Sequence, residues 1–223
     1  YCTTLGRGEF IRLMFEAASV SFEEIGDQAE IIRQTDLSGQ SGTQPRCSPS
    51  PAFAPPLVVG PDGTAISQTT AILAKLGKEF GFYPEPADEF NALQLALSVA
   101  DFQMEGQNAF HPVDPSGSYA DQIEEAKVSC AKFCDVRIPK WLNHFNHWIT
   151  LRDTDYVFGN KLLYSDIALY HVIDACRFQF PDTFSQHSTD AINAYVSRVG
   201  SLPAIAAYEA SSRCVPYGGD SMM

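Results

Sequence analysis

The chain has 223 residues and a formal net charge of −12, and 45% of its residues are hydrophobic, enough for a core without disulfide bonds. So acidic a chain repels phosphate backbones, which argues against nucleic-acid binding. No apolar run reaches the roughly 20 residues of a membrane-spanning helix, so we expect no membrane partner.

The first part of the chain predicts alternating strands and helices. Residues 1–4 predict a strand, and residues 9–18 a helix, because apolar side chains recur there every three or four positions. Residues 21–25 alternate apolar and polar side chains, which favours a second strand parallel to the first. Residues 36–54 are rich in Ser, Gly, Gln and Pro and predict a loop.

A β-hairpin and a helix follow this loop. Residues 56–59 and 65–67 predict short strands around the turn Pro61-Asp62-Gly63, and residues 68–80 predict a helix. A Pro directly before an apolar strand often has a cis peptide bond, which re-aims the preceding backbone groups.

The start of that helix suits an anion. Gln68 and Thr69 offer amide and hydroxyl groups beside the free backbone N–H groups of a helix N-terminus, which favour a carboxylate. The segment therefore indicates a site for an extended, peptide-like anion. Simple helix capping by Ser67 or Thr69 is the alternative.

The chain after residue 87 predicts helices alone. Pro84 and Pro86 mark residues 81–86 as a linker, so we expect two domains, residues 1–81 and residues 87–223. The predicted helices cover residues 88–107, 118–149 with a bend at Pro139, 163–178, 189–199 and 203–212.

The cysteines and histidines predict no metal site. The six cysteines are scattered, which is typical of free thiols in a reducing compartment, and the N-terminus lacks the pattern of a secretory signal, so we expect a cytoplasmic protein. Cys130 and Cys134 lie one helical turn apart without a second pair, and His144 and His147 lack a third ligand.

Four segments resemble motifs of one enzyme family, in the right order. They are GRGEFIRL at residues 6–13, SQTTAI at 67–72, GNKLLYSDIA at 159–168 and SLPAIAAY at 201–208. The chain therefore resembles the cytosolic glutathione S-transferases of the Tyr type, and most of all the sigma-like group. In that pattern a catalytic Tyr precedes the Arg by six residues, which is Tyr1 here, and Ala54-Pro55 falls at the cis-Pro position.

The resemblance implies a fold and an activity. The fold is an α/β thioredoxin-like N-terminal domain followed by an all-α helical domain, in a homodimer. The activity is conjugation of glutathione, the co-substrate, to a small electrophile. Asp166 would help to start the central helix, where Leu163 replaces the hydroxyl residue that relatives use as a cap, so the cap must come from elsewhere.

The resemblance also implies roles for individual residues. Tyr1 and Arg7 would be catalytic, because a Tyr hydroxyl that donates to the glutathione sulfur stabilises the thiolate. Those that would bind the tripeptide are Tyr1, Ala54, Pro55, Gln68, Thr69 and, in the neighbouring subunit's site, Asp101. Those that would line an acceptor pocket between the domains are Leu5, Phe102, Met104, Gln107 and Phe110.

Alternatives remain open for several of these residues. Arg7 could instead pair with Glu9, Asp101 could be a solvated charge, the aromatic and Met residues could be plain core, and Cys2 could be a nucleophile.

The function has alternatives too: a glutathione-dependent isomerase, or a non-enzymatic ligand-binding or structural protein on the same fold. Phe53 replaces a Gln of the relatives, and the Trp and Lys that hold the glycine carboxylate there are not recognisable in residues 36–53.

Overall fold

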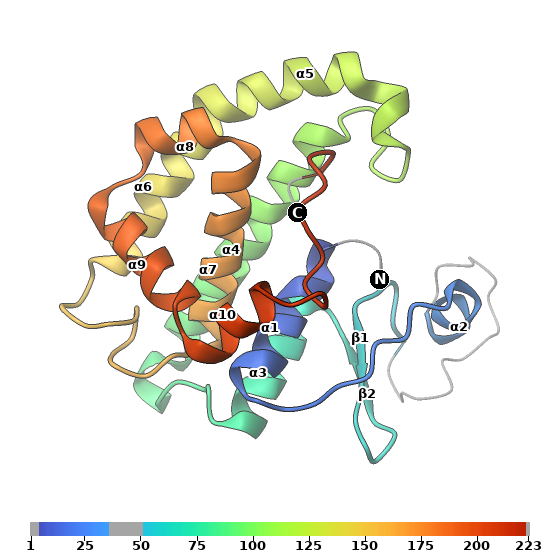
Figure 1. Ribbon diagram of the computed structural model, residues 1–223, viewed down its shortest axis with the longest axis vertical. Coiled ribbons are helices and arrows are strands. Elements are labelled where there is room, and N and C mark those ends of the chain that lie inside the picture. The colour runs from blue at the N-terminus through green and yellow to red at the C-terminus, as the bar shows by residue number, and fades with distance from the viewer. Residues whose placement is uncertain (1–4, 36–50, 222–223) are drawn as a thin grey trace.

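The computed structural model describes residues 5–35 and 51–221. In its N-terminal part the first and third α-helices pack together beside a two-stranded antiparallel hairpin, in which Leu57 lies opposite Ser67 and Val59 opposite Ala65 (Figure 1). The elements are η1 (Gly6–Gly8), α1 (Glu9–Ala17), α2 (Gln28–Gln34), β1 (Leu57–Val59), β2 (Ala65–Ser67) and α3 (Thr69–Phe80). The predicted first helix, hairpin and following helix are confirmed.

Two features of this part differ from the prediction. Residues 21–25 are irregular, because they pair with no strand of the described residues and are held by side chains instead: the Phe22 ring stacks on Phe15 and the Glu24 carboxylate binds Arg12. Helix α2 was not predicted. The strand expected at residues 1–4 and residues 36–50 of the expected loop lie outside the described residues.

The C-terminal part is helical, as predicted. Helix α4 ends at Phe110, three residues beyond its predicted end, and a π-helical turn ends at Arg137, two residues before Pro139, where a bend was expected. The elements are η3 (Pro86–Asp88), α4 (Glu89–Phe110), η4 (Tyr119–Gln122), α5 (Ile123–Lys132), η5 (Phe133–Arg137), α6 (Ile138–Ile149), α7 (Tyr164–Gln179), α8 (Pro181–His187), α9 (Asp190–Gly200) and α10 (Pro203–Glu209). Within the described residues, none of these helices is both long and apolar enough to cross a bilayer.

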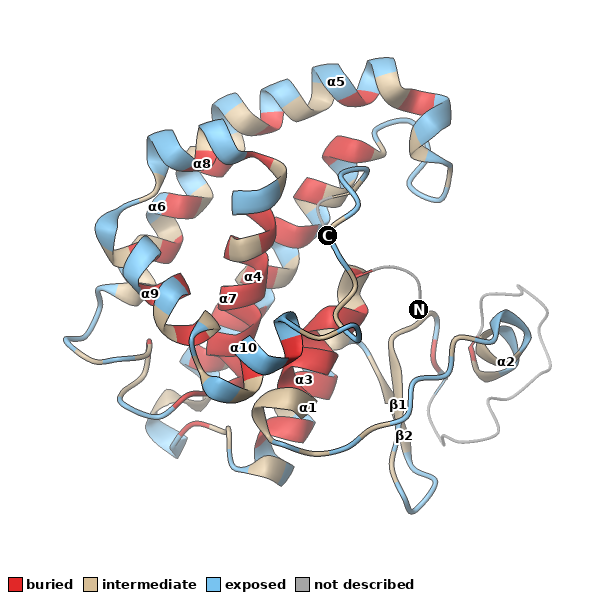
Figure 2. Cartoon of the chain, in the orientation of Figure 1, coloured by how far each residue is buried: buried red, intermediate tan, exposed pale blue. Residues whose placement is uncertain are grey.

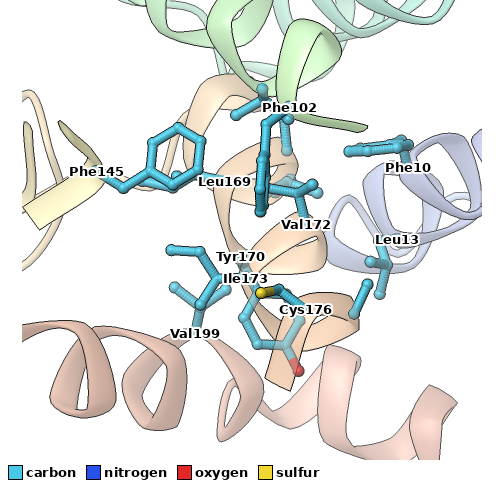
Figure 3. Packing of buried hydrophobic residues seen from close by; sticks show 14 of the residues in the cluster. Phe10, Leu13, Phe102, Phe145, Leu169, Tyr170, Val172, Ile173, Cys176 and Val199 are labelled. Atoms are coloured by element: carbon cyan, nitrogen blue, oxygen red, sulfur yellow. The ribbon is translucent and has the colours of Figure 1, made fainter. Parts of the chain in front are cut away.

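Helix α7 lies at the centre of the molecule. It packs against α4, α1, α3, α8 and α9, and Figure 2 shows it red along most of its length because nearly every side chain is buried. In the close-up of Figure 3, Leu169 lies near Phe102 and Phe145, whereas Val172 lies on the side of Phe10 and Leu13 of α1. One core therefore joins the two parts of the chain.

The buried carboxylate of Asp166 holds the start of α7. Its Oδ2 accepts from the backbone N–H of Leu163 at 2.9 Å, and its Oδ1 accepts from that of Val157 at 3.0 Å and from the Tyr195 hydroxyl at 3.0 Å. Burial raises the pKa of Asp166 to about 6, although all of these donors favour the charged form. Asp166 thus supplies the anchoring that the apolar side chain of Leu163 cannot.

A second buried network ties α1 to α10. The Arg12 guanidinium donates to Glu9 at 2.8 Å and, through its other nitrogens, to Glu24. The same Glu9 oxygen accepts from the hydroxyl of Tyr208 at 3.1 Å. Because a buried charge is tolerated only when it is paired and hydrogen-bonded, the ends of the chain are held together by this cluster.

Replacing Asp166 by Ala should lower the free energy of unfolding by about 3–5 kcal/mol, because two backbone N–H groups and a hydroxyl would lose their shared acceptor. Asp182→Ala, which removes an exposed carboxylate from the first turn of α8, should cost at most about 1 kcal/mol. Urea unfolding of the wild type and of both variants measures these losses in the free energy of unfolding. Equal losses would show that Asp166 acts only as a helix-terminal charge.

His171 should make the protein sensitive to acid. It lies inside α7 with its ring edge-on to Phe10 at 4.7 Å, and burial, together with the charge of Arg12, lowers its pKa to about 3. An unfolded His titrates near 6.5, so the unfolded state binds the extra proton first, and stability falls as the pH drops from 6.5 towards 3. By pH 5 this group alone should cost about 2 kcal/mol.

The variant His171→Phe lacks the titrating ring and should lose that part of the acid sensitivity. Unfolding free energies of both proteins at pH 7, 6 and 5 provide the comparison. Parallel curves for wild type and variant would contradict the expectation.

Candidate functional site

A cavity of about 230 Å³ lies where the two parts of the chain meet. The N-terminal end of α3 forms one wall, α4 forms the opposite wall, and Ala168 of α7 contributes from the core. Of the residues predicted for function, Arg7, Gln68, Thr69, Asp101 and Met104 all line it. The structure thus brings together side chains that are far apart in the sequence.

Gln68 and Thr69 form the α3 wall in an unusual conformation. Gln68 has φ 71° and ψ 112°, a region that non-glycine residues adopt at a cost of about 1–3 kcal/mol and that often marks functional sites. The buried Oγ1 of Thr69 has no hydrogen-bond partner among the described residues. With the first N–H groups of α3, this wall presents unfilled hydrogen-bonding capacity and the positive end of a helix.

Arg7 reaches the cavity from η1. Its Nε donates to the side-chain Oε1 of Gln103 at 2.9 Å, and its Nη2 lies 3.6 Å from the Met104 sulfur. The alternative pairing with Glu9 is wrong, because Glu9 binds Arg12 instead. Arg7 therefore brings a positive charge to the cavity that Glu9 does not neutralise.

Gln103 is a cavity residue that sequence reasoning missed. Its side chain is buried, with only 6% of the residue exposed, and its Nε2 lies 3.5 Å from Oε1 of Gln107. The sequence contains only a weak signal for Gln103. Gln103 and Gln107 share a helical face with the small residues Ala96 and Ala100, and polar side chains on an otherwise apolar face suggest a hydrogen-bond partner inside the protein.

The residues expected to line an acceptor pocket are divided by the structure. Met104 lines the cavity and is partly exposed. Phe102 is fully buried among Phe133, Trp141 and Phe145, and Phe110 packs on Tyr119 and Phe180. Leu5 is also buried. Phe102, Phe110 and Leu5 are therefore core residues and do not line the cavity.

The segment before β1 differs from the prediction by one position. The cis peptide bond joins Pro55 to Pro56 rather than Ala54 to Pro55. Ala54 and Pro55 are half-buried and do not line the cavity. Tyr1, the predicted catalytic residue, and Cys2, its alternative, lie outside the described residues.

The histidine and the cysteines of the C-terminal part that could bind a metal or react are structural in this fold. His144 Nε2 accepts from the indole N–H of Trp148 at 3.1 Å, which occupies the lone pair that a metal ion would need. Burial raises the pKa of the Cys130 thiol to about 11 and that of Cys134 above its usual value, so neither is an activated nucleophile.

Comparison with known proteins identifies relatives of the whole chain. Residues 108–212 match the family model described as glutathione S-transferase, C-terminal domain. Glutathione S-transferase P 10 of Caenorhabditis elegans is 28% identical over 187 residues, which cover 78% of this chain and 76% of the relative. Glutathione S-transferase 1 of Ascaris suum is 24% identical over 221 residues, or 97% of each chain.

Among solved structures, the pi-class glutathione S-transferase of Onchocerca volvulus has a TM-score of 0.72 at 18% identity, and the match covers 99% of this chain and 96% of that one. The chain is thus similar to glutathione S-transferases over most of its length, and the expected fold is confirmed. Assignment to the Tyr type and the sigma-like group stays a prediction.

Proposed function

We propose that this protein is a glutathione transferase that adds the glutathione thiolate to small electrophiles. The observation that carries the proposal is the cavity between the two parts of the chain, which is lined by the N-terminus of α3, by Thr69, whose hydroxyl has no partner among the described residues, and by the cation of Arg7. Its relatives carry the name glutathione S-transferase. The proposed division into a domain of residues 1–81 and one of residues 87–223 puts this cavity at their junction, a common place for ligand sites.

The α3 wall suits one end of the tripeptide. A carboxylate there would accept from Thr69 Oγ1 and the first N–H groups of the helix, as anions do at helix N-termini. Asp101, exposed at the cavity, would meet an amino group, in this subunit's site or its neighbour's. At about 230 Å³ the cavity is smaller than most complete ligand sites, so it would hold part of glutathione, with Ala54 and Pro55 binding the backbone beyond it.

The chemistry depends on ionising the glutathione thiol. An ordinary thiol has a pKa near 8.5, so only a few per cent is thiolate at neutral pH. A hydrogen bond from Tyr1 and the positive charge of Arg7 would both favour the thiolate. The sulfur then forms a bond to the electrophilic carbon while the leaving group departs with its electron pair, which is a detoxification reaction when the electrophile is toxic.

A cytoplasmic homodimer is part of the proposal. Helix α4 carries the exposed apolar side chains of Phe90 (77% exposed) and Leu97, and Phe53 is 71% exposed on the N-terminal part. Apolar side chains left in water in this way favour a partner surface. Analytical ultracentrifugation of the wild type and of Leu97→Glu measures the assembly.

Tyr1→Phe should lower turnover of an aryl halide with glutathione about 10–100-fold and raise the apparent pKa of the thiol by about two units, because the stabilising hydroxyl is lost. Glutathione should still bind. Tyr83→Phe, which removes a linker hydroxyl that donates to Glu89 at the start of α4, is the matched control and should be as active as wild type. If wild type neither binds glutathione nor turns over, a non-enzymatic ligand-binding or structural role is the better interpretation.

Thr69→Val should weaken glutathione binding about 10- to 100-fold without destabilising the free protein. The hydroxyl has no partner to lose in the described structure, whereas a hydrogen bond to a charged ligand contributes about 1.5–3 kcal/mol. Thr69→Ser keeps the hydroxyl and should bind nearly as tightly as wild type. Isothermal titration calorimetry measures both, and unchanged binding by Thr69→Val would remove Thr69 from the site.

A further inference from the structure

Arg7 differs from the other arginines of residues 5–35 and 51–221. All the others form an ion pair with Asp or Glu, whereas Arg7 has no carboxylate within 4.0 Å among the described residues. Its partners are neutral, the amide oxygen of Gln103 and the sulfur of Met104. In a chain with a net charge of −12, a cation without an acidic partner at the wall of a cavity is an exception.

We propose that Gln103 is a positioning residue, which fixes Arg7 towards the cavity through a neutral acceptor and so leaves its charge available to the glutathione thiolate. This rests on the proposed function and deepens it. Gln103 suits the task because its side chain is buried and its amide N–H₂ lies near Gln107, so that its oxygen is directed at the Arg7 Nε. Glutamate has the same shape but would pair with Arg7 and neutralise it.

The other charged groups on the neighbouring elements do not neutralise Arg7. Asp101 lines the same cavity from α4 but is exposed to solvent, where its field is screened. Glu105, two residues beyond Gln103, is bound to Arg137 through two hydrogen bonds of 2.7 Å. On α1, Glu9 is already paired with Arg12 inside the core. The residue at position 103 therefore decides how much of the Arg7 charge reaches the ligand.

The test compares two substitutions at position 103. Gln103→Glu keeps the acceptor and adds a negative charge, so the pKa of the bound glutathione thiol should rise by about one unit. Gln103→Met removes the acceptor without adding charge, so Arg7 is held less firmly, turnover should fall and the thiol pKa should rise by only about 0.3 units. Gln186→Glu, exposed on α8 and remote from the cavity, adds the same charge and should change neither.

Two readouts follow the thiol: the ultraviolet absorbance of bound thiolate against pH, and the pH profile of kcat/KM. Thermal unfolding of the free proteins adds a third, because Gln103→Glu would gain an ion pair and should be at least as stable as wild type. A merely structural role for Gln103 would move stability and leave the thiol pKa in place.

Several results would overturn the proposal. If wild type ionises bound glutathione but Gln103→Glu has the same thiol pKa, the role of Gln103 is refuted and the proposed function stands. The same holds if Gln103→Glu and Gln103→Met shift the pKa equally, because charge would then not be the cause. If wild-type protein binds no thiolate at all, the proposed function fails and this inference with it.

Discussion

The helical part of the molecule depends on one buried carboxylate. Asp166 joins the loop at Val157, the first residue before α7 and the hydroxyl of Tyr195 on α9 in a single set of hydrogen bonds. Helix α7 is buried on nearly every face, so its first N–H groups have no access to water and need partners within the protein. Once α7 is fixed, α1, α3 and α4 pack against it and the cavity walls take their positions.

The charges are distributed so that the cavity keeps a positive charge, that of Arg7, without a neighbouring carboxylate to neutralise it among the described residues. Most basic side chains of the described residues are neutralised nearby, as Arg12 is by Glu9 and Glu24, and Arg137 by Glu105. A cation held by neutral partners keeps its long-range field, and the low dielectric of a half-buried cavity strengthens that field. The overall negative charge thus coexists with a local preference for an anion.

Local sequence rules predicted most of the elements, and they failed where a distant partner decides the outcome. The apolar spacing of α1 and the turn at Pro61-Asp62-Gly63 were sufficient on their own. The alternating residues 21–25 were not, since a strand also needs a neighbour to pair with. Helix α2 was missed although Asp27 caps it by accepting from the Glu30 N–H at 2.8 Å, a signal that the sequence contains.

For the candidate site, too, local features could be predicted from the sequence and distant contacts could not. Gln68 and Thr69 were found because a helix N-terminus is a local feature, whereas the part played by Gln103 depends on Arg7, which is 96 residues away in the sequence. Helical spacing alone could not separate Met104, at the cavity, from Phe102, inside an aromatic cluster, because periodicity gives a face and not its neighbour.

The link between Glu9 and Tyr208 has a consequence for synthesis. These two residues are 199 positions apart, and the nearby contact of Glu16 with Arg213 spans 197. The first helix therefore leaves the ribosome long before the residues that complete its surroundings exist, and it must wait with a paired but exposed Glu9 and Arg12. Contacts of such sequence separation form late and slowly, so the surroundings of α1 should be completed only after α10 has been synthesised.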